Sequence, residues 1–152
     1  MRTALSRGLA IRCTAALLVA ACAAGGPRPI AYGKEACAFC RMTVSDPRFG
    51  AELVTTRGRV YTFDSIECLA SYYLGNRDGV ASMWVSAGAG STALQPAERA
   101  RYSGTPGHGA GSGSAEPALM PDETGTLDWA AVLALVERER RAPDGSGAPE
   151  VQ

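Results

Sequence analysis

Two short runs rich in β-branched and aromatic residues predict a β-hairpin in the first half of the chain. The runs cover residues 52–56 and 59–63, and an Arg-Gly pair separates them. A two-residue gap that contains glycine is typical of a tight hairpin turn. In the register that this gap implies, the hairpin is antiparallel and Val54 lies opposite Tyr61.

A helix is expected directly after this hairpin. Asp64 is a suitable N-cap, and Glu67 three residues later completes a capping box. Phe63 and Cys68 occupy the positions of a hydrophobic staple, and a Gly-Asn pair at 75–76 ends the helix. Apolar residues recur at the i, i+3, i+4 and i+7 spacing of one helix face. They are Ile66, Leu69, Ala70 and Tyr73.

The second half of the chain adds short strands and one more helix. Residues 80–86 predict a strand, and residues 92–102 predict a short strand followed by a helical turn. A last helix is expected from Leu127 to about Arg140, with Thr126 as its N-cap. Its apolar face is formed by Trp129, Val132, Leu133 and Val136. The order strand–strand–helix–strand, followed by a C-terminal helix, indicates an α+β fold.

The first 21 residues predict an export signal. Three arginines and no acidic residue precede a short apolar run, which is too short to span a bilayer permanently. The sequence VAAC at 19–22 resembles a bacterial lipobox, in which the cysteine becomes the lipidated first residue. We therefore expect lipidation of Cys22 and a protein anchored in the cell envelope, facing the periplasm. Ala23 after the anchor favours the outer membrane.

The chain after this signal divides into three parts. Residues 22–31 are rich in glycine and proline and are expected to form a tether. Residues 32–141 are expected to form one domain, whose pattern is clearest over 32–86. Residues 142–152 predict a disordered tail.

Charge argues against a nucleic-acid partner. The whole chain has 15 basic and 15 acidic residues. Loss of the three signal arginines gives the remainder a formal net charge of −3. A nucleic-acid-binding protein normally carries a basic stripe, so we expect no binding to DNA or RNA.

The most informative chemistry is a cluster of sulfur-containing residues. Cys37 and Cys40 are spaced so that both thiols can reach one metal ion, and Met42 adds a thioether two residues later. Soft sulfur ligands favour Cu(I) over hard ions, and a thioether favours copper over zinc. The segment therefore predicts a Cu(I) site.

Two further residues are candidate ligands. Cys68 is expected in the first turn of the first helix, where the helix dipole favours a thiolate; it is equally well explained as a small core residue. His108, the only histidine, lies between two glycines in a low-complexity stretch and is able to swing toward a metal. The same stretch is a poor scaffold for a Ser-His-Asp triad, and we expect no catalytic residues.

Other interpretations of these cysteines remain open. Export permits a disulfide between Cys37 and Cys40, which leaves the third thiol free. A thiol–disulfide oxidoreductase would use the same pair, although such sites normally begin a helix after a strand. A zinc-binding structural lipoprotein is a third possibility.

Two segments resemble the signature of the NosL family. They are Tyr32–Leu53 (YGKEACAFCRMTVSDPRFGAEL) and Val60–Leu69 (VYTFDSIECL), and both follow the lipobox. NosL proteins are lipoprotein copper chaperones that help to assemble the copper centres of nitrous oxide reductase. The resemblance implies that Cys40 and Met42 hold Cu(I), and that the partners are nitrous oxide reductase and its assembly machinery. Where NosL chains commonly carry Thr-Pro-Met-Gly, this chain has TPGHG, which places His108 near the missing methionine.

Overall fold

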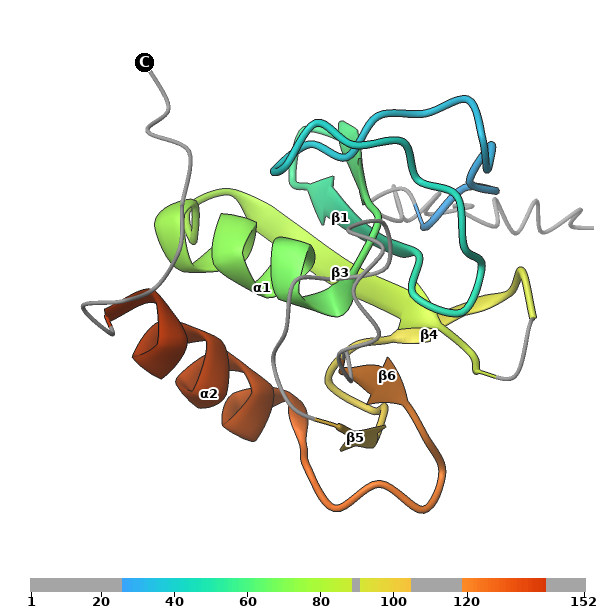
Figure 1. The fold of residues 1–152 in the computed structure, drawn as a ribbon. Helices are drawn as coiled ribbons and strands as arrows, with labels where there is room; N and C mark the ends of the chain where they lie inside the picture. Colours follow the sequence, from blue (N-terminus) through green and yellow to red (C-terminus); the bar gives the residue numbers. More distant parts are fainter. Residues whose placement is uncertain (1–25, 89–90, 105–118, 142–152) are drawn as a thin grey trace, which may run out of the picture.

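The central sheet has four antiparallel strands in the order β2-β1-β3-β4 (Figure 1). This computed structural model describes residues 26–88, 91–104 and 119–141. The strands of the sheet are β1 (Ala51–Thr55), β2 (Val60–Phe63), β3 (Val80–Ser86) and β4 (Leu94–Pro96). A two-stranded sheet follows, made of β5 (Tyr102–Ser103) and β6 (Met120–Pro121). With two helices, α1 (Ile66–Gly75) and α2 (Trp129–Arg141), the fold is α+β, as predicted.

The β1–β2 hairpin forms as predicted, but the predicted register is wrong by one residue. Leu53, and not Val54, lies opposite Tyr61. The Thr55 N–H donates to the Arg59 carbonyl at 2.8 Å, so the connecting loop has three residues and not two. Gly58 closes this loop with a φ of 78°, which glycine adopts without steric cost.

Both predicted helices are present, and both begin one or two residues later than predicted. The N-cap of α1 is Ser65, whose hydroxyl accepts a hydrogen bond from the Cys68 N–H, and not Asp64. The capping box and the staple predicted around Asp64 therefore do not apply. At α2 the Asp128 carboxylate accepts from the Ala131 N–H at 2.8 Å and caps the helix in place of Thr126. Each true cap is a Ser or Asp that directly precedes the first helical residue.

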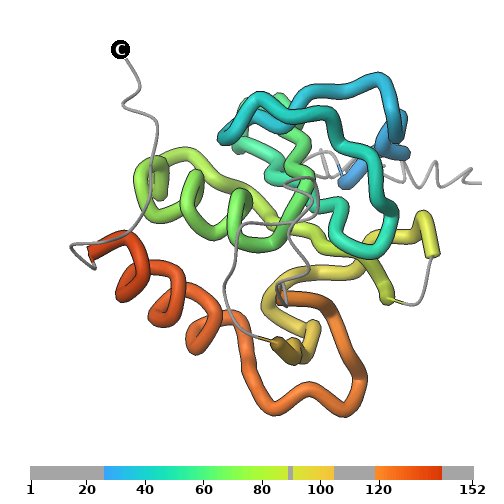
Figure 2. Tube along the Cα trace, in the orientation of Figure 1, coloured from blue at the N-terminus to red at the C-terminus, as the bar shows by residue number. Residues whose placement is uncertain are grey.

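The core lies between the sheet and the two helices. Helix α1 packs against β1, β2 and α2, and Figure 2 shows the path by which the chain returns to bring α2 beside α1. The largest fully buried side chains come from β1, β2, α1, β5 and the residue before β6: Tyr102, Phe63, Leu53, Ile66, Leu69 and Leu119. The buried Glu67 ties α1 to the later segment, because its carboxylate accepts from the Leu119 N–H at 2.7 Å. This packing fixes the start of α1 against the end of β2.

The segment before the first strand also packs on the sheet. Residues 26–31, which we expected to belong to a tether, include the buried Ile30. The Arg28 N–H donates to Glu52 at 3.0 Å, and the Arg28 guanidinium pairs with Glu35. This part of the chain therefore has fixed contacts with the domain.

Several predictions concern residues outside the described ranges. They are the export signal at 1–21, Cys22, His108 and the tail at 142–152. Neither described helix is long and apolar enough to cross a membrane.

Candidate metal centre

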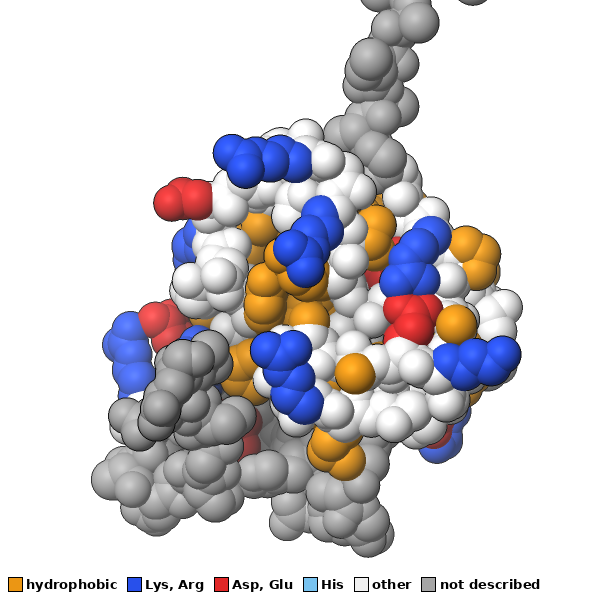
Figure 3. All heavy atoms as spheres, turned by 90° about the horizontal axis from the view of Figure 1, so that it is seen from above, with side chains coloured by type: hydrophobic (Ala, Val, Ile, Leu, Met, Phe, Trp, Pro, Cys, Tyr) orange, Lys and Arg blue, Asp and Glu red, His pale blue; other side chains and the backbone are white. Residues whose placement is uncertain are grey.

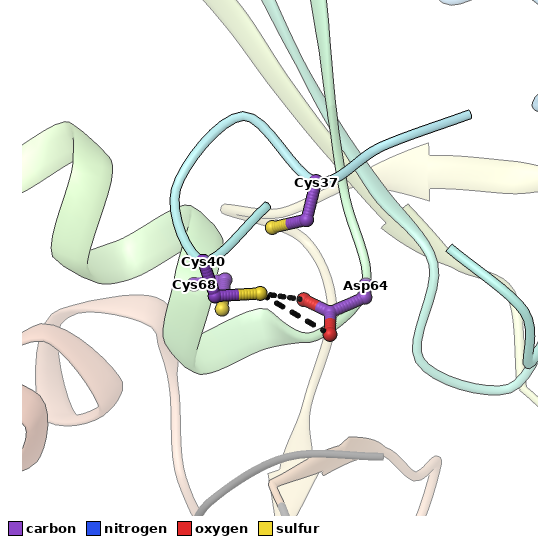
Figure 4. A group of neighbouring side chains, drawn as sticks. All are labelled: Cys37, Cys40, Asp64 and Cys68. Atoms are coloured by element: carbon purple, nitrogen blue, oxygen red, sulfur yellow. Dashed lines mark hydrogen bonds between the residues drawn. The ribbon is translucent and has the colours of Figure 1, made fainter. Parts of the chain in front are cut away.

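Four side chains from three segments converge at the N-terminal end of helix α1 (Figure 4). Cys37 and Cys40 come from the loop before β1, Asp64 from the junction of β2 and α1, and Cys68 from the first turn of α1. Their sulfur and carboxylate atoms all lie within 4.8 Å of one another. The group is a candidate metal-binding cluster with three thiols and one carboxylate.

Backbone hydrogen bonds shape the loop that carries the first two cysteines. Ala36 and Thr43 form an isolated antiparallel bridge, and the Cys37 N–H donates to the Met42 carbonyl at 2.7 Å. Inside this bridge the Arg41 N–H donates to the Cys37 carbonyl at 3.1 Å. Arg41 has a φ of 69°, a strained conformation for a residue with a side chain. The loop thus turns back on itself and carries both thiols on one tight turn.

A second set of contacts holds this loop against the sheet. The Ala38 N–H donates to the Thr62 carbonyl of β2 at 2.8 Å. Because Thr62 lies two residues before Asp64, this bond sets the cysteine loop beside the junction where α1 begins. A backbone hydrogen bond therefore holds the loop beside the helix start.

The junction supplies the remaining two side chains. Ser65 occupies the cap position, which leaves the Asp64 carboxylate free to point toward the cysteines. The Cys40 thiol donates to Asp64 Oδ1 and Oδ2 at 3.4 and 3.5 Å. Cys68 follows the cap by three residues, so that its sulfur lies at the N-terminal end of α1.

Burial differs across the cluster. Cys37 is 0% exposed and Asp64 is 4% exposed, whereas Cys40 and Cys68 are half-buried. Solvent therefore reaches the group on the side of Cys40 and Cys68. Cys37 and Asp64 are the most deeply buried members of the cluster.

The cluster favours one negative charge on Cys37. Hydrogen bonding from the Cys68 thiol and from the backbone N–H groups of Asp64 and Cys40 lowers the pKa of Cys37 to about 7, although burial opposes this change. The pKa of Cys68 is raised, because its thiol is hydrogen-bonded to Cys37 and Cys40 and is partly buried. We predicted that the helix dipole would favour a Cys68 thiolate. The contacts with the neighbouring thiols act in the opposite direction and favour the protonated form of Cys68.

The spacing of the four atoms suits a single ion. Two sulfurs bound at about 2.3 Å to one ion are at most about 4.6 Å apart. The observed spread of up to 4.8 Å therefore requires only a small inward movement. Two or three neighbouring thiolates repel one another. A bound cation would compensate their negative charge.

The structure brings together three of the five predicted ligands. Cys37, Cys40 and Cys68 belong to the cluster, and all three are free thiols. Met42 is 40% exposed on the same loop, and its role as a ligand stays a prediction. His108 lies outside the described residues.

Asp64 is the member of the candidate cluster that the sequence interpretation missed. We assigned its carboxylate to the helix cap, and Ser65 takes that position in the structure. The sequence could have indicated this role for Asp64. The adjacent Ser65 is an equally good helix cap, and Asp64 lies four residues before Cys68.

No family model, curated protein sequence or solved structure matches this chain. Its own fold and site therefore define its class: an α+β protein with a candidate metal-binding centre of three cysteines and one aspartate.

Proposed function

We propose that this protein is a NosL-like lipoprotein that carries Cu(I) and delivers it during maturation of nitrous oxide reductase. The observation that carries the proposal is the convergence of Cys37, Cys40 and Cys68 within 4.8 Å, together with Asp64. In this proposal Cu(I) is cargo, the lipid on Cys22 anchors the carrier at the outer membrane, and the protein is not an enzyme.

The chemistry of the donors favours Cu(I). Three sulfur atoms form a soft ligand set, and Cu(I) prefers soft thiolates. Met42, exposed on the same loop, offers a thioether for an ion that enters or leaves. Because metal ligands must be deprotonated, the low pKa of Cys37 supplies the first thiolate near neutral pH.

The uneven burial of the cluster suits a carrier. Cu(I) would be held on its buried side by Cys37 and would remain accessible beside the half-buried Cys40 and Cys68. A partner can then add a ligand on the exposed side while the carrier releases one. The ion would pass between the two proteins without a free-ion step.

Zinc binding is a second candidate function, and Asp64 is the observation that favours it. Thiolates and carboxylates are both zinc ligands, and three thiolates with one carboxylate would complete the tetrahedral set of four that zinc prefers. Asp64 is already directed at the cluster through its contact with Cys40. In this alternative the ion would stabilise the domain and would not be delivered.

The geometry argues against a thiol–disulfide oxidoreductase. Such an enzyme needs an accessible nucleophilic thiolate, usually where a helix begins. Here the low-pKa thiol of Cys37 is fully buried, and the pair lies on a turn between bridge residues.

Anaerobic competition titration of the reduced domain against a chromophoric Cu(I) chelator tests the proposal. Wild-type protein should retain one Cu(I) per chain, and Cys40→Ser should lose stoichiometric binding. Ser82→Ala, a change on β3 that leaves the cluster intact, is the matched control. If Cys40→Ser binds Cu(I) as tightly as wild type, the assignment is wrong. If only zinc is retained after anaerobic purification, the second candidate replaces the first.

A further inference from the structure

Two arginines and two tyrosines form a surface patch beside the cysteine cluster. We call it the arginine–tyrosine patch and define it by Arg41, Arg59, Tyr61 and Tyr72. The Arg59 guanidinium lies 4.7 Å from the centre of the Tyr61 ring, and the Tyr61 and Tyr72 rings are 5.3 Å apart. Both arginines are exposed, and both tyrosines are half-buried.

Burial and the Tyr61 hydroxyl raise the pKa of Tyr72, and the charges of Arg59 and Arg41 oppose that rise. Both guanidinium groups therefore act on the same hydroxyl. Ring contacts join Arg59, Tyr61 and Tyr72, and Arg41 of the cysteine loop lies close enough to act on Tyr72 through its charge.

The patch adjoins the exposed side of the metal centre. Arg41 directly follows Cys40, and Tyr72 lies four residues after Cys68, on the same face of α1. Met42, the next residue of the loop, is the one exposed large hydrophobic side chain in the described ranges. A protein that approaches Cys40 and Cys68 to exchange metal must therefore meet the patch.

The charge of the patch is not neutralised within the described part of the chain. Arg28, Arg48 and Arg141 each form an ion pair with a carboxylate. Arg41 and Arg59 form none with any described residue. Figure 3 shows Lys and Arg side chains around hydrophobic side chains on the face seen from above, the side on which Figure 1 places the loop before β1. Arginine and tyrosine are both enriched in protein interfaces and among the residues that dominate binding energy there.

We propose that the arginine–tyrosine patch docks an acidic surface on the protein with which this chain exchanges its metal. The inference rests on the proposed carrier function and adds the chemistry of the partner. Arginine forks pair with carboxylates in bidentate geometry. A positive patch around the exchange site steers an acidic partner toward it and fixes its orientation. A buried structural zinc site has no need of such a surface at its opening.

An NMR titration of the metal-free protein tests the docking. The probes are a synthetic peptide of alternating Glu and Ala and its Gln counterpart. The Glu peptide should shift backbone resonances of Arg41, Arg59 and Tyr72, and the Gln peptide should not. The shifts should weaken as salt screens the charges.

Charge reversal locates the docking site. Arg41→Glu with Arg59→Glu should weaken Glu-peptide binding by at least about tenfold. Arg99→Glu with Arg101→Glu changes the net charge equally, on the exposed segment after β4, and should have little effect. Arg59→Glu alone serves if the double variant does not fold.

The outcomes separate docking from metal carriage. Equal weakening by both charge reversals, or equal binding of both peptides, overturns the docking proposal. Patch-dependent binding to phosphatidylglycerol vesicles without binding to the Glu peptide also overturns it, in favour of a lipid surface. Chelator competition on the same proteins reports Cu(I) retention independently. Failure there rejects the carrier function, while the peptide titration, measured without metal, still decides whether the patch recognises carboxylates.

Discussion

Asp64 accepts a hydrogen bond from the thiol of Cys40, a residue 24 positions earlier in the chain. The bond joins the cysteine loop to the start of α1. When a cation replaces the Cys40 proton, Asp64 loses this donor. Its carboxylate then either binds the ion or withdraws from it, and the two proposed functions differ on this point.

Asp64→Asn should therefore separate zinc from copper. Zinc uses the carboxylate as a fourth ligand, so its affinity should fall by at least about tenfold. Cu(I) is satisfied by sulfur, and its affinity should change by less than about threefold. Competition titrations with chelators for each ion measure both effects, and the exposed Asp78→Asn is the control. A parallel loss of affinity for both ions would contradict this division of roles.

The low pKa of Cys37 predicts how metal affinity depends on pH. Above about pH 7 Cys37 is a thiolate, and a metal ion displaces no proton from it. Below this pH it is a thiol, so each bound ion must release about one additional proton. The affinity should therefore fall more steeply with decreasing pH below about 7 than above it.

Isothermal titration in buffers of different ionisation enthalpy counts the released protons. The count should rise by about one between pH 8 and pH 6. A constant count over this range would mean that Cys37 is not the first thiolate.

Local patterns predict most of the fold, and contacts between distant segments account for the errors. The hairpin and both helices follow from spacing within each segment. The register of the hairpin was wrong because Gly58 adopts a positive φ and closes a longer loop. The three cysteines were recognisable as residue types. The role of Asp64 was not, because it depends on the loop at 37–42 folding against β2 through Ala38 and Thr62.

Ser65 is predicted to stabilise both α1 and the metal centre. Its hydroxyl caps the helix through the Cys68 N–H at 3.2 Å. Ser65→Ala should lower the free energy of unfolding by about 1 kcal/mol. It should also weaken metal binding, because the first turn of α1 positions the Cys68 thiol. Urea denaturation and chelator competition measure the two effects.

Ser65→Asn retains a capping oxygen and should restore both properties. If Ser65→Ala leaves the unfolding midpoint unchanged, Ser65 is not the effective cap. If the asparagine variant recovers stability and not metal affinity, the hydroxyl has a role at the site beyond capping.

Glu52 is predicted to destabilise the domain at neutral pH. This carboxyl group of β1 is fully buried, and only Oε2 has a hydrogen-bond donor among the described residues, the Arg28 N–H. Burial raises the pKa of this carboxyl group above its ordinary value of 4.5. The stability that the protonated form contributes is complete below pH 4.5 and is lost as the pH rises through the raised pKa.

Glu52→Gln keeps the shape of the side chain and removes its charge, so it should raise the free energy of unfolding at pH 7 by about 1 kcal/mol. Urea denaturation of the metal-free protein at pH 7 and pH 4 measures the difference, which should shrink at the lower pH. A variant less stable than wild type at pH 7 would show that the ionised carboxylate is well accommodated.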